Sequence, residues 1–205
     1  MNKKRGVLSR IVGGFRTPSK RWGAGVLTAF GFIAGMFFWI GFEGFVASTS
    51  TEEFCLSCHE MRAFPYAEYE QSAHFGSPSG VRPICADCHV PKAFFPKMQA
   101  KIRAILVEIP SHLAGNLDTR EKFEAKREEL ATRALERMRG NDSAGCRSCH
   151  DVNAMAADEQ KLRAVREHEA GWAVGETCVD CHMGIAHELP ASMKEAEEEE
   201  VDFDF

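Results

Sequence analysis

Apolar residues are concentrated in one continuous stretch near the start of the chain and become sparse after it. The stretch runs from about Trp22 to Val46 and contains a single charged residue, Glu43. A helix needs about 20 apolar residues to cross a bilayer, and Trp22 and Trp39 suit positions at or near the membrane interface. The pattern therefore predicts one transmembrane anchor over residues 22–47, embedded in a lipid bilayer.

A cleaved signal peptide is the alternative interpretation of this stretch. Its apolar region usually spans about 7–15 residues before a small-x-small site. Val46-Ala47-Ser48 loosely resembles such a site, but the apolar run is too long, so we favour an uncleaved anchor. Gly31 and Gly35 form a G-x-x-x-G pair, which is a pattern of helix-dimer faces. Because glycine is common in membrane helices in general, a homodimer remains only an alternative.

The rest of the chain follows helical periodicity. An apolar stripe at helical spacing predicts a helix over Pro96–Ile109, and Pro110 is expected to end or kink it. The stripe of this helix consists of Met98, Ile102, Ile105 and Ile109.

A second, highly charged helix is predicted over Thr119–Arg139, where Asp118 and Glu121 resemble a capping box.

A third helix is predicted over Ala154–His168. No convincing alternation of period two appears anywhere in the 205 residues, so the expected fold class is all-α. Aliphatic residues outside the anchor look too few for a self-sufficient core. A bound group is therefore expected to fill the interior of the helical domain.

Charge is distributed unevenly along the chain. Residues 1–47 contain seven Lys or Arg and one acid, whereas residues 48–205 contain 18 Lys or Arg and 29 acids. A basic flank on the N-terminal side of a membrane helix predicts that residues 1–21 stay in the cytoplasm. Because this flank abuts an apolar stretch, no nucleic-acid partner is expected. The acidic tail 191–205 is expected to be solvated.

Four copies of Cys-x-x-Cys-His account for every cysteine in the chain. This motif attaches c-type haem: two thiols add to the vinyl groups of one porphyrin, and the histidine can ligate the iron. Zinc sites and disulfide frameworks are the alternatives, but neither needs a histidine after each pair. The motifs are Cys55-Cys58-His59, Cys85-Cys88-His89, Cys146-Cys149-His150 and Cys178-Cys181-His182. The sequence therefore predicts four covalently bound haem c groups and electron transfer.

The spacing of the motifs predicts a duplicated two-haem unit. The motif histidines lie 30 residues apart in the first pair and 32 apart in the second. We expect a tetrahaem domain over 48–190 that is composed of two dihaem units, 48–92 and 141–190, with a helical insertion at 93–140. Attachment of c-type haem takes place in the bacterial periplasm, so this domain is expected there and the anchor in the inner membrane.

Four six-coordinate haems need eight axial ligands, and the motif histidines supply at most four. Methionines are further candidates, and Met61 lies two residues after His59. Residues two apart on a helix point to nearly opposite sides, so these two side chains compete for one face of the first haem. Which of them ligates the iron stays open from the residues alone. The other candidate histidines are His74, His112, His168 and His187.

From the anchor to about residue 190, the chain resembles the NapC/NirT family of membrane-anchored tetrahaem quinol dehydrogenases. The most specific segments are FCLSCHEM (54–61), SGVRPICADCHVPK (79–92), KFEAKREELA (122–131), the stretch 141–150 around CRSCH and TCVDCHMGIAHELP (177–190). The resemblance implies that the protein oxidises menaquinol or ubiquinol and passes electrons to a periplasmic reductase, with nitrate reductase the best fit.

The resemblance also implies a set of iron ligands. Met61 rather than His59 would ligate the first haem on its proximal side. The proximal ligands of haems two to four would be His89, His150 and His182. The distal ligands of haems two, three and four would be, in this order, His168, His187 and His74. His112 matches no ligand position of the family.

Two further residues match family positions that are implicated in quinol oxidation beside the first haem: Lys101 and Glu108. Seven residues apart on a helix, they are expected to share a face. A carboxylate near the haem can accept a quinol proton, and a lysine can hold the quinol oxygen. The alternative is a solvent-facing ion pair with a neighbour such as Arg103. A plain electron-transfer adaptor without a quinol site, or a donor to a nitrite or other reductase, is the alternative function.

Overall fold

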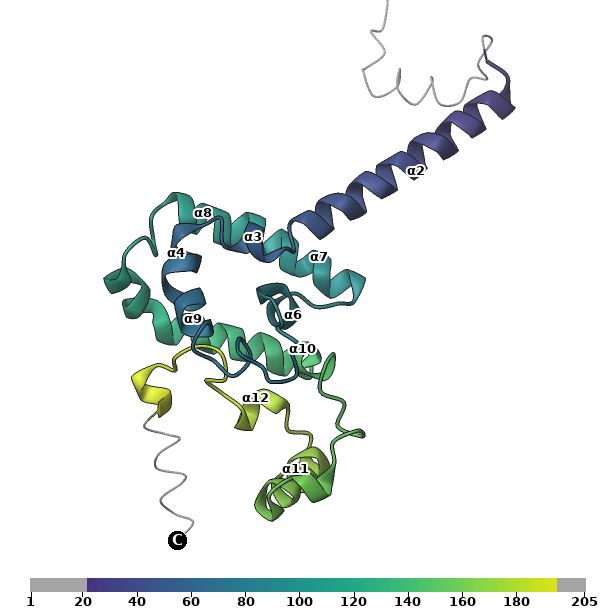
Figure 1. Ribbon diagram of the computed structural model, residues 1–205. Coiled ribbons are helices and arrows are strands. Elements are labelled where there is room, and N and C mark those ends of the chain that lie inside the picture. The colour runs from purple at the N-terminus through teal and green to yellow at the C-terminus, as the bar shows by residue number, and fades with distance from the viewer. Residues whose placement is uncertain (1–21, 195–205) are drawn as a thin grey trace, which may run out of the picture. The chain divides into compact units, whose positions relative to one another are not determined.

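The computed structural model describes residues 22–194 (Figure 1), and every regular element in that range is helical. The all-α fold class with one N-terminal apolar helix is therefore confirmed. The chain divides into two compact units, residues 1–48 and 49–205. The basic segment 1–21 and the acidic residues 195–205 lie outside the described residues.

The anchor helix, α2 (Ala24–Ser48), consists almost entirely of apolar residues. Its stretch Gly25–Ser48 has a mean hydropathy of 1.8, and its most apolar window has no buried residues. A helix of 25 residues is about 37 Å long, which exceeds the hydrocarbon core of about 30 Å. This helix has the length and composition of the expected membrane span.

The first helices of the second unit follow one another closely. α3 (Glu52–Cys55) is capped by Thr51, whose hydroxyl accepts the Phe54 N–H. A continuous helical run then contains one π-turn, and Pro65 lies inside that turn. Proline has no N–H to donate, and a wider turn lets the helix pass it. The run comprises α4 (His59–Met61), η1 (Arg62–Tyr66) and α5 (Ala67–Tyr69).

The expected helix Pro96–Ile109 is longer at both ends than the sequence indicated. It comprises α7 (Phe94–Arg103), the π-turn η2 (Ala104–Glu108) and α8 (Ile109–Leu113). Of the two outcomes expected at Pro110, an end or a kink of the helix, the end is wrong. The π-turn directly before α8 opens the hydrogen-bond ladder where the missing proline N–H would break it, so the helix continues past Pro110.

The second expected helix is α9 (Arg120–Gly140), but its cap differs from the expectation. Thr119 is the N-cap, because its hydroxyl accepts the N–H of Lys122 at 3.4 Å. Asp118 instead accepts a hydrogen bond from the Lys122 ammonium at 2.7 Å. The capping box predicted at Asp118 and Glu121 is therefore one residue out of register.

The helix predicted over Ala154–His168 is displaced along the chain. A short 3₁₀ turn covers Ala157–Glu159, and α11 (Leu162–Val174) then extends to Gly175, which adopts φ 84°. Helix propensity is a weak prior that tertiary contacts override. Here Gln160 is extended and its side chain bonds to His168, so the helix begins after it.

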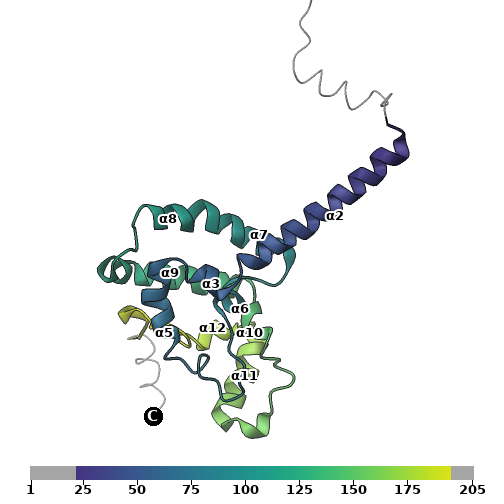
Figure 2. The ribbon, with the colours of Figure 1, turned by 45° about the horizontal axis from the view of Figure 1, so that its top comes forward.

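The core of the second unit contains few side chains. Among its described residues, the buried hydrophobic ones are Phe64, Tyr69 and Val179. Phe64 packs against Phe123 of α9 with ring centroids 5.1 Å apart. Figures 1 and 2 show the remaining short helices close to one another, with α12 (Cys178–Cys181) beside α9. This core is as thin as the composition indicated, so bound groups have to contribute to packing.

Candidate haem-binding site

All four cysteine motifs begin on short helices. α3 ends at Cys55, the first cysteine of the first motif. The other three motifs begin on α6 (Cys85–His89), α10 (Ala144–Arg147) and α12. None of the eight thiols is paired in a disulfide. Each pair of cysteines is thus presented on a single turn of chain, as attachment to one porphyrin edge requires.

The residue before the second cysteine of each motif has a structural role that repeats through the chain. It is serine in the first and third motifs, where the hydroxyls of Ser57 and Ser148 donate to the carbonyl three residues earlier at 2.7 Å. It is aspartate in the second and fourth, where the N–H three residues earlier donates to Asp87 at 2.9 Å and to Asp180 at 2.7 Å. This alternation is a sequence signal of duplication beyond motif spacing.

The first cysteines of the two motifs in each half lie next to each other. A hydrogen bond from the Cys85 side chain lowers the pKa of the Cys55 thiol to about 7. Burial raises the pKa of the Cys146 thiol, and the neighbouring Cys178 raises it further. These shifts describe the thiols before haem attachment. The contacts place two haem-attachment edges side by side in each half, as electron transfer between haems requires.

The two halves meet where α10 packs against α6. A Cβ atom added to Gly145 would lie 2.9 Å from the Asp87 carbonyl oxygen and 3.0 Å from that of Cys88. Only glycine permits this approach of two backbones. The second and third motifs are therefore in direct contact, so the four motifs form one continuous series.

Histidine rings face each other in pairs across the motifs. Two imidazoles that ligate one iron from opposite faces have ring centres on the order of 6 Å apart, given metal–nitrogen bonds of about 2 Å. Three motif histidines each have such a partner outside the motifs. The centroid separations are 6.1 Å for His89–His187, 6.2 Å for His150–His74 and 6.0 Å for His182–His168.

Several of these rings are held by their Nδ1 atom, which leaves Nε2 for a metal. His168 Nδ1 lies 2.8 Å from the Gln160 side-chain oxygen, and His187 Nδ1 lies 3.1 Å from the Pro65 carbonyl. Such an acceptor favours the Nδ1–H tautomer and orients the ring, as in most histidine metal sites. His74 Nδ1 is buried and has no hydrogen-bond partner.

Burial also keeps one of these pairs neutral. Burial lowers the pKa of His89 to about 4, and it lowers the pKa of His187 as well. Only a neutral imidazole can donate its nitrogen lone pair to a metal. Together with the ring spacing, this protonation state shows that the residues fit a haem with two axial imidazoles.

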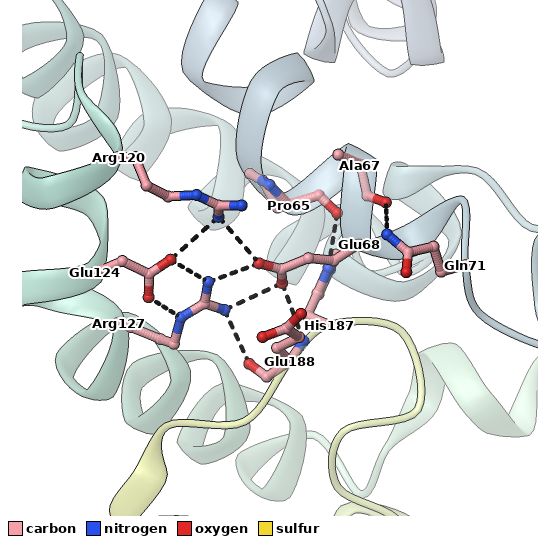
Figure 3. Close-up of polar contacts among 9 residues, drawn as sticks. All are labelled: Pro65, Ala67, Glu68, Gln71, Arg120, Glu124, Arg127, His187 and Glu188. Carbon is pink, nitrogen blue, oxygen red and sulfur yellow. Dashed lines mark hydrogen bonds and ion pairs between the residues drawn. The ribbon is translucent and has the colours of Figure 1, made fainter.

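A network of charged groups holds the segment that contains His187 (Figure 3). Arg127 of α9 makes two hydrogen bonds to Glu68 of α5, at 2.6 and 3.1 Å, and two more to Glu124. It also donates to the Glu188 carbonyl at 3.0 Å, while the Glu188 N–H donates to Glu68 at 3.0 Å. Burial raises the pKa of Glu68, but the bonds from Arg127 and Glu188 outweigh it and hold that pKa below its ordinary value.

The observed pairing differs from the one that the family resemblance implied. His187 faces His89 of the second motif and not His150 of the third. The histidine expected at the fourth haem, His74, faces His150 instead. Each half of the domain thereby supplies one ring to the other half, whereas His168 faces His182 within its own half.

The first motif differs from the other three. The Met61 side chain lines a cavity together with His89 and His187, the pair of the second motif. His59 faces His112 of α8, with ring centroids 6.1 Å apart. The residues alone kept His112 among the candidate ligands, and the family resemblance then set it aside. The count of eight histidines for four motifs was the signal that favoured it.

Lys101 and Glu108 are not brought together. The Lys101 ammonium donates to the carbonyl of Thr49 and, at 3.0 Å, to its hydroxyl. The Glu108 carboxylate pairs with Arg103 at 2.5 Å. The π-turn between them alters the seven-residue spacing that would put them on one face. Both still act on Cys55, since Lys101 lowers the pKa of its thiol and Glu108 raises it.

Comparison with known proteins places the chain in a family. Residues 17–192 match the NapC/NirT cytochrome c family, N-terminal region. No solved structure matches. The chain is 44% identical to the denitrification system component NirT of Stutzerimonas stutzeri over 96% of both chains. It is also 44% identical to the cytochrome c-type protein NapC of Escherichia coli K12, again over 96% of both chains.

A third relative is longer than this chain. The cytochrome c-type protein TorC of Escherichia coli K12 is 42% identical over 89% of this chain but only 47% of TorC. The match with NirT and NapC, by contrast, extends from the apolar helix through all four cysteine motifs. The chain therefore belongs to the NapC/NirT cytochrome c family, as an electron-transfer protein with covalently bound haem c and a single membrane anchor.

Proposed function

We propose that this protein binds four haem c groups, oxidises quinol in the membrane and passes the electrons to a periplasmic reductase. The arrangement of the cysteine motifs is the main support for this proposal. Paired thiols within each half and the backbone contact between α6 and α10 join all four attachment sites into one series. When bound, the haems supply the one-electron chemistry, while the protein sets their spacing and ligands.

The first motif is the proposed point at which electrons enter. Lys101 binds Thr49, the residue that directly follows the anchor helix in the chain. Lys101 also lowers the pKa of the Cys55 thiol, so this motif is close to the residue through which the domain is joined to the anchor. The neighbouring π-turn and α8 expose apolar side chains, among them Leu106 at 69% and Leu113 at 78%. An exposed apolar surface suits contact with lipid and access for an apolar quinol.

Lys101 and Glu108 provide the polar groups for the quinol. Burial lowers the pKa of Lys101, and its ammonium is fixed by Thr49 where it can meet a quinol oxygen. Glu108 is paired with Arg103 and largely exposed, so it can release that partner and accept a proton. A positioned acid–base group typically contributes about 10²–10⁴-fold to the rate of a proton-coupled step.

The test is reduction of the purified tetrahaem protein in liposomes by menaquinol and ubiquinol analogues, followed by haem absorbance. Lys101→Leu and Glu108→Gln should each slow quinol-driven reduction by about 10²-fold, while dithionite still reduces all haems. Thr49→Val removes only the hydroxyl contact of Lys101 and should have a much smaller effect. Glu129→Gln breaks an equivalent ion pair with Arg133 on α9 and serves as the matched control.

The adaptor function is the second candidate, favoured by one observation. Glu108 and Lys101 both have protein partners and do not face each other. If no quinol analogue reduces the wild-type protein, or if both substitutions leave the rate unchanged, the protein is an adaptor without a quinol site. Reoxidation of the reduced protein by a periplasmic nitrate reductase, compared with a nitrite reductase, would identify the electron acceptor. The best fit is nitrate reductase.

The proposed topology places the basic residues 1–21 in the cytoplasm and the haem domain in the periplasm of the inner membrane. The support is the excess of Lys and Arg before the anchor. A protease added outside spheroplasts should digest the haem domain and leave an N-terminal tag intact. Digestion of the tag instead would reverse the orientation.

A further inference from the structure

The eight histidines of the chain form four facing pairs, and each pair contains one motif histidine. The fourth pair joins His59 of the first motif to His112 of α8. Its centroid separation of 6.1 Å falls within the 6.0–6.2 Å range of the other three pairs. The first motif thus has the same ring separation as the motifs for which a bis-histidine haem is expected.

A buried carboxylate lies beside both rings of this pair. Glu60 is 6% exposed, and one of its oxygens lies 2.5 Å from His112 Nδ1. The other oxygen is buried without a hydrogen-bond partner, although His59 Nδ1 lies 3.2 Å from it. Burial of a carboxylate is unfavourable unless it is paired, and the paired oxygen here has the His112 imidazole as its partner. A carboxylate on the Nδ1 atom of a ligating histidine fixes its tautomer and directs its Nε2 to the metal.

Met61 lines a cavity with Leu56 of the first motif and with Cys85, Cys88 and His89 of the second motif. His112 lies beside the first motif, since its imidazole, a Glu60 oxygen and the Cys58 sulfur are all within 4.8 Å of one another. Because Cys58 is an expected attachment cysteine, His112 is close to the edge at which the first haem would be attached.

We propose that His112 is the axial ligand opposite His59 at the first haem, with Glu60 as the carboxylate that orients the His112 ring. His59 Nε2 lies 3.2 Å from the Asp118 carbonyl and exchanges that contact for the iron. The proposal rests on the haem content proposed above and goes beyond its quinol step. With His59 and His112 as its two ligands, the iron would have no free position for a quinol oxygen, and quinol would have to give its electrons without binding to iron.

The wild-type tetrahaem protein provides the first test. Electron paramagnetic resonance and near-infrared magnetic circular dichroism should show four low-spin haems with two histidines each, and no methionine–iron band. The ferrous protein should not bind carbon monoxide at any haem. A high-spin haem or a methionine-ligated haem in the wild type would overturn the proposal without any variant being needed.

His112→Leu assigns the ligand. Haem content, measured as the pyridine haemochrome, should stay at the wild-type value, while one of the four bis-histidine signals is lost and one haem becomes reactive to carbon monoxide. Met61→Leu should leave all four signals in place. Glu60→Gln should retain both ligands but shift the signal and the midpoint potential of that one haem. Retention of all four bis-histidine signals in His112→Leu contradicts the proposal.

The outcomes separate this inference from the proposed function. A wild-type haem content below four per chain would refute the tetrahaem proposal itself. Four haems with an unchanged His112→Leu spectrum would refute only the assignment of His112. If His112→Leu does not mature, His112→Met keeps a ligating side chain, and the appearance of a new methionine–iron band in it supports the assignment. A His112→Met spectrum identical to wild type overturns it.

Discussion

The two halves of the haem domain, residues 48–92 and 141–190, repeat the same local chemistry but complete it differently. In each half a serine motif precedes an aspartate motif, and the first cysteines of the two motifs touch. The second half supplies the ring opposite its own last motif, His182, from α11. The first half obtains the ring opposite His59 from the helical insertion. The duplication therefore accounts for the cysteine motifs, which are alike in the two halves. The source of the facing ring differs: it is α11 within the second half, and the helical insertion for the first half.

The halves are also interlocked. His74 of the first half faces His150 of the second, and His187 of the second half faces His89 of the first. Neither half contains the full set of facing rings for its own motifs. The comparison teaches that the repeat seen in the sequence is not a pair of independent folding units.

Removal of a histidine ring that faces a motif of the other half should have the largest effect on stability. His187→Leu removes a ring that links the halves, whereas His168→Leu removes one within the second half. Each variant should lose one low-spin haem signal, but His187→Leu should also lower the yield of mature protein and the unfolding temperature. The measurements are the low-spin haem count and thermal unfolding followed by haem absorbance. Equal losses of stability in the two variants would argue against interlocking.

Arg127→Leu should be the most damaging substitution outside the histidines. It leaves the buried carboxylate of Glu68 with Arg120 at 3.6 Å and the Glu188 N–H as its remaining partners. Breaking a buried pair costs about 3–5 kcal/mol, and the remaining partners reduce this loss. The unfolding temperature should fall clearly, and the signal of the His89–His187 haem should broaden. Arg133→Leu on the same helix breaks only an exposed pair and should cost less than about 1 kcal/mol. A similar effect of both variants would contradict a positioning role.

The same pair should make the protein sensitive to acid. Its partners hold the folded-state pKa of Glu68 below the ordinary value for a glutamate, which is about 4.3. The stabilisation is therefore fully present above that ordinary pKa and is lost as pH falls through the lower folded-state pKa. Glu68→Gln should flatten the pH dependence of the unfolding temperature in this acid range relative to wild type. An unchanged slope would remove Glu68 as its source.

A smaller loss is expected from Gly145→Ala, which tests the contact between the halves. The new methyl group would lie 2.9 Å from a backbone oxygen of Asp87, and overpacking of this kind costs about 1–3 kcal/mol. Gly140→Ala at the end of α9 meets nothing within 4 Å and should be neutral or slightly stabilising. Thermal unfolding distinguishes the two, and electron transfer between the halves should slow only in Gly145→Ala.

The smallest effects should come from the repeated caps. Asp87→Asn and Asp180→Asn weaken the bond to an N–H at a helix start, which is worth about 0.5–2 kcal/mol. Because the two positions make the same contact, the two losses should be similar. Ser57→Ala and Ser148→Ala should cost about 1 kcal/mol or less. Unequal losses within either pair would show that the halves have diverged structurally.

Local elements could be read from the sequence with small errors. The anchor and α9 were placed within two residues, because apolar periodicity and composition act over neighbouring residues. The errors occurred where a tertiary contact or a wider turn overrides local propensity. The helix continues past Pro110 because a π-turn precedes it. α11 begins only after Gln160, whose side-chain oxygen contacts His168.

Which residues face one another could not be read from the sequence. Lys101 and Glu108 have a spacing that predicts a shared face of the helix. The π-turn between them changes that spacing, and Lys101 contacts Thr49 whereas Glu108 contacts Arg103. Nothing in the sequence singled out Glu60, which directly follows the first motif, and His112 matched no ligand position of the family. Their contact joins α4 to α8, which no local pattern encodes.

The sequence by itself determined the anchor, the eight attachment cysteines, the duplicated arrangement of motifs and the helical class. Each of these depends on residues that are neighbours along the chain, where spacing alone sets the chemistry. Only the tertiary structure decided that His187 faces His89, that His74 faces His150 and that His112 faces His59. An iron site needs rings on opposite sides of one point, and packing between helices far apart in sequence selects which rings those are.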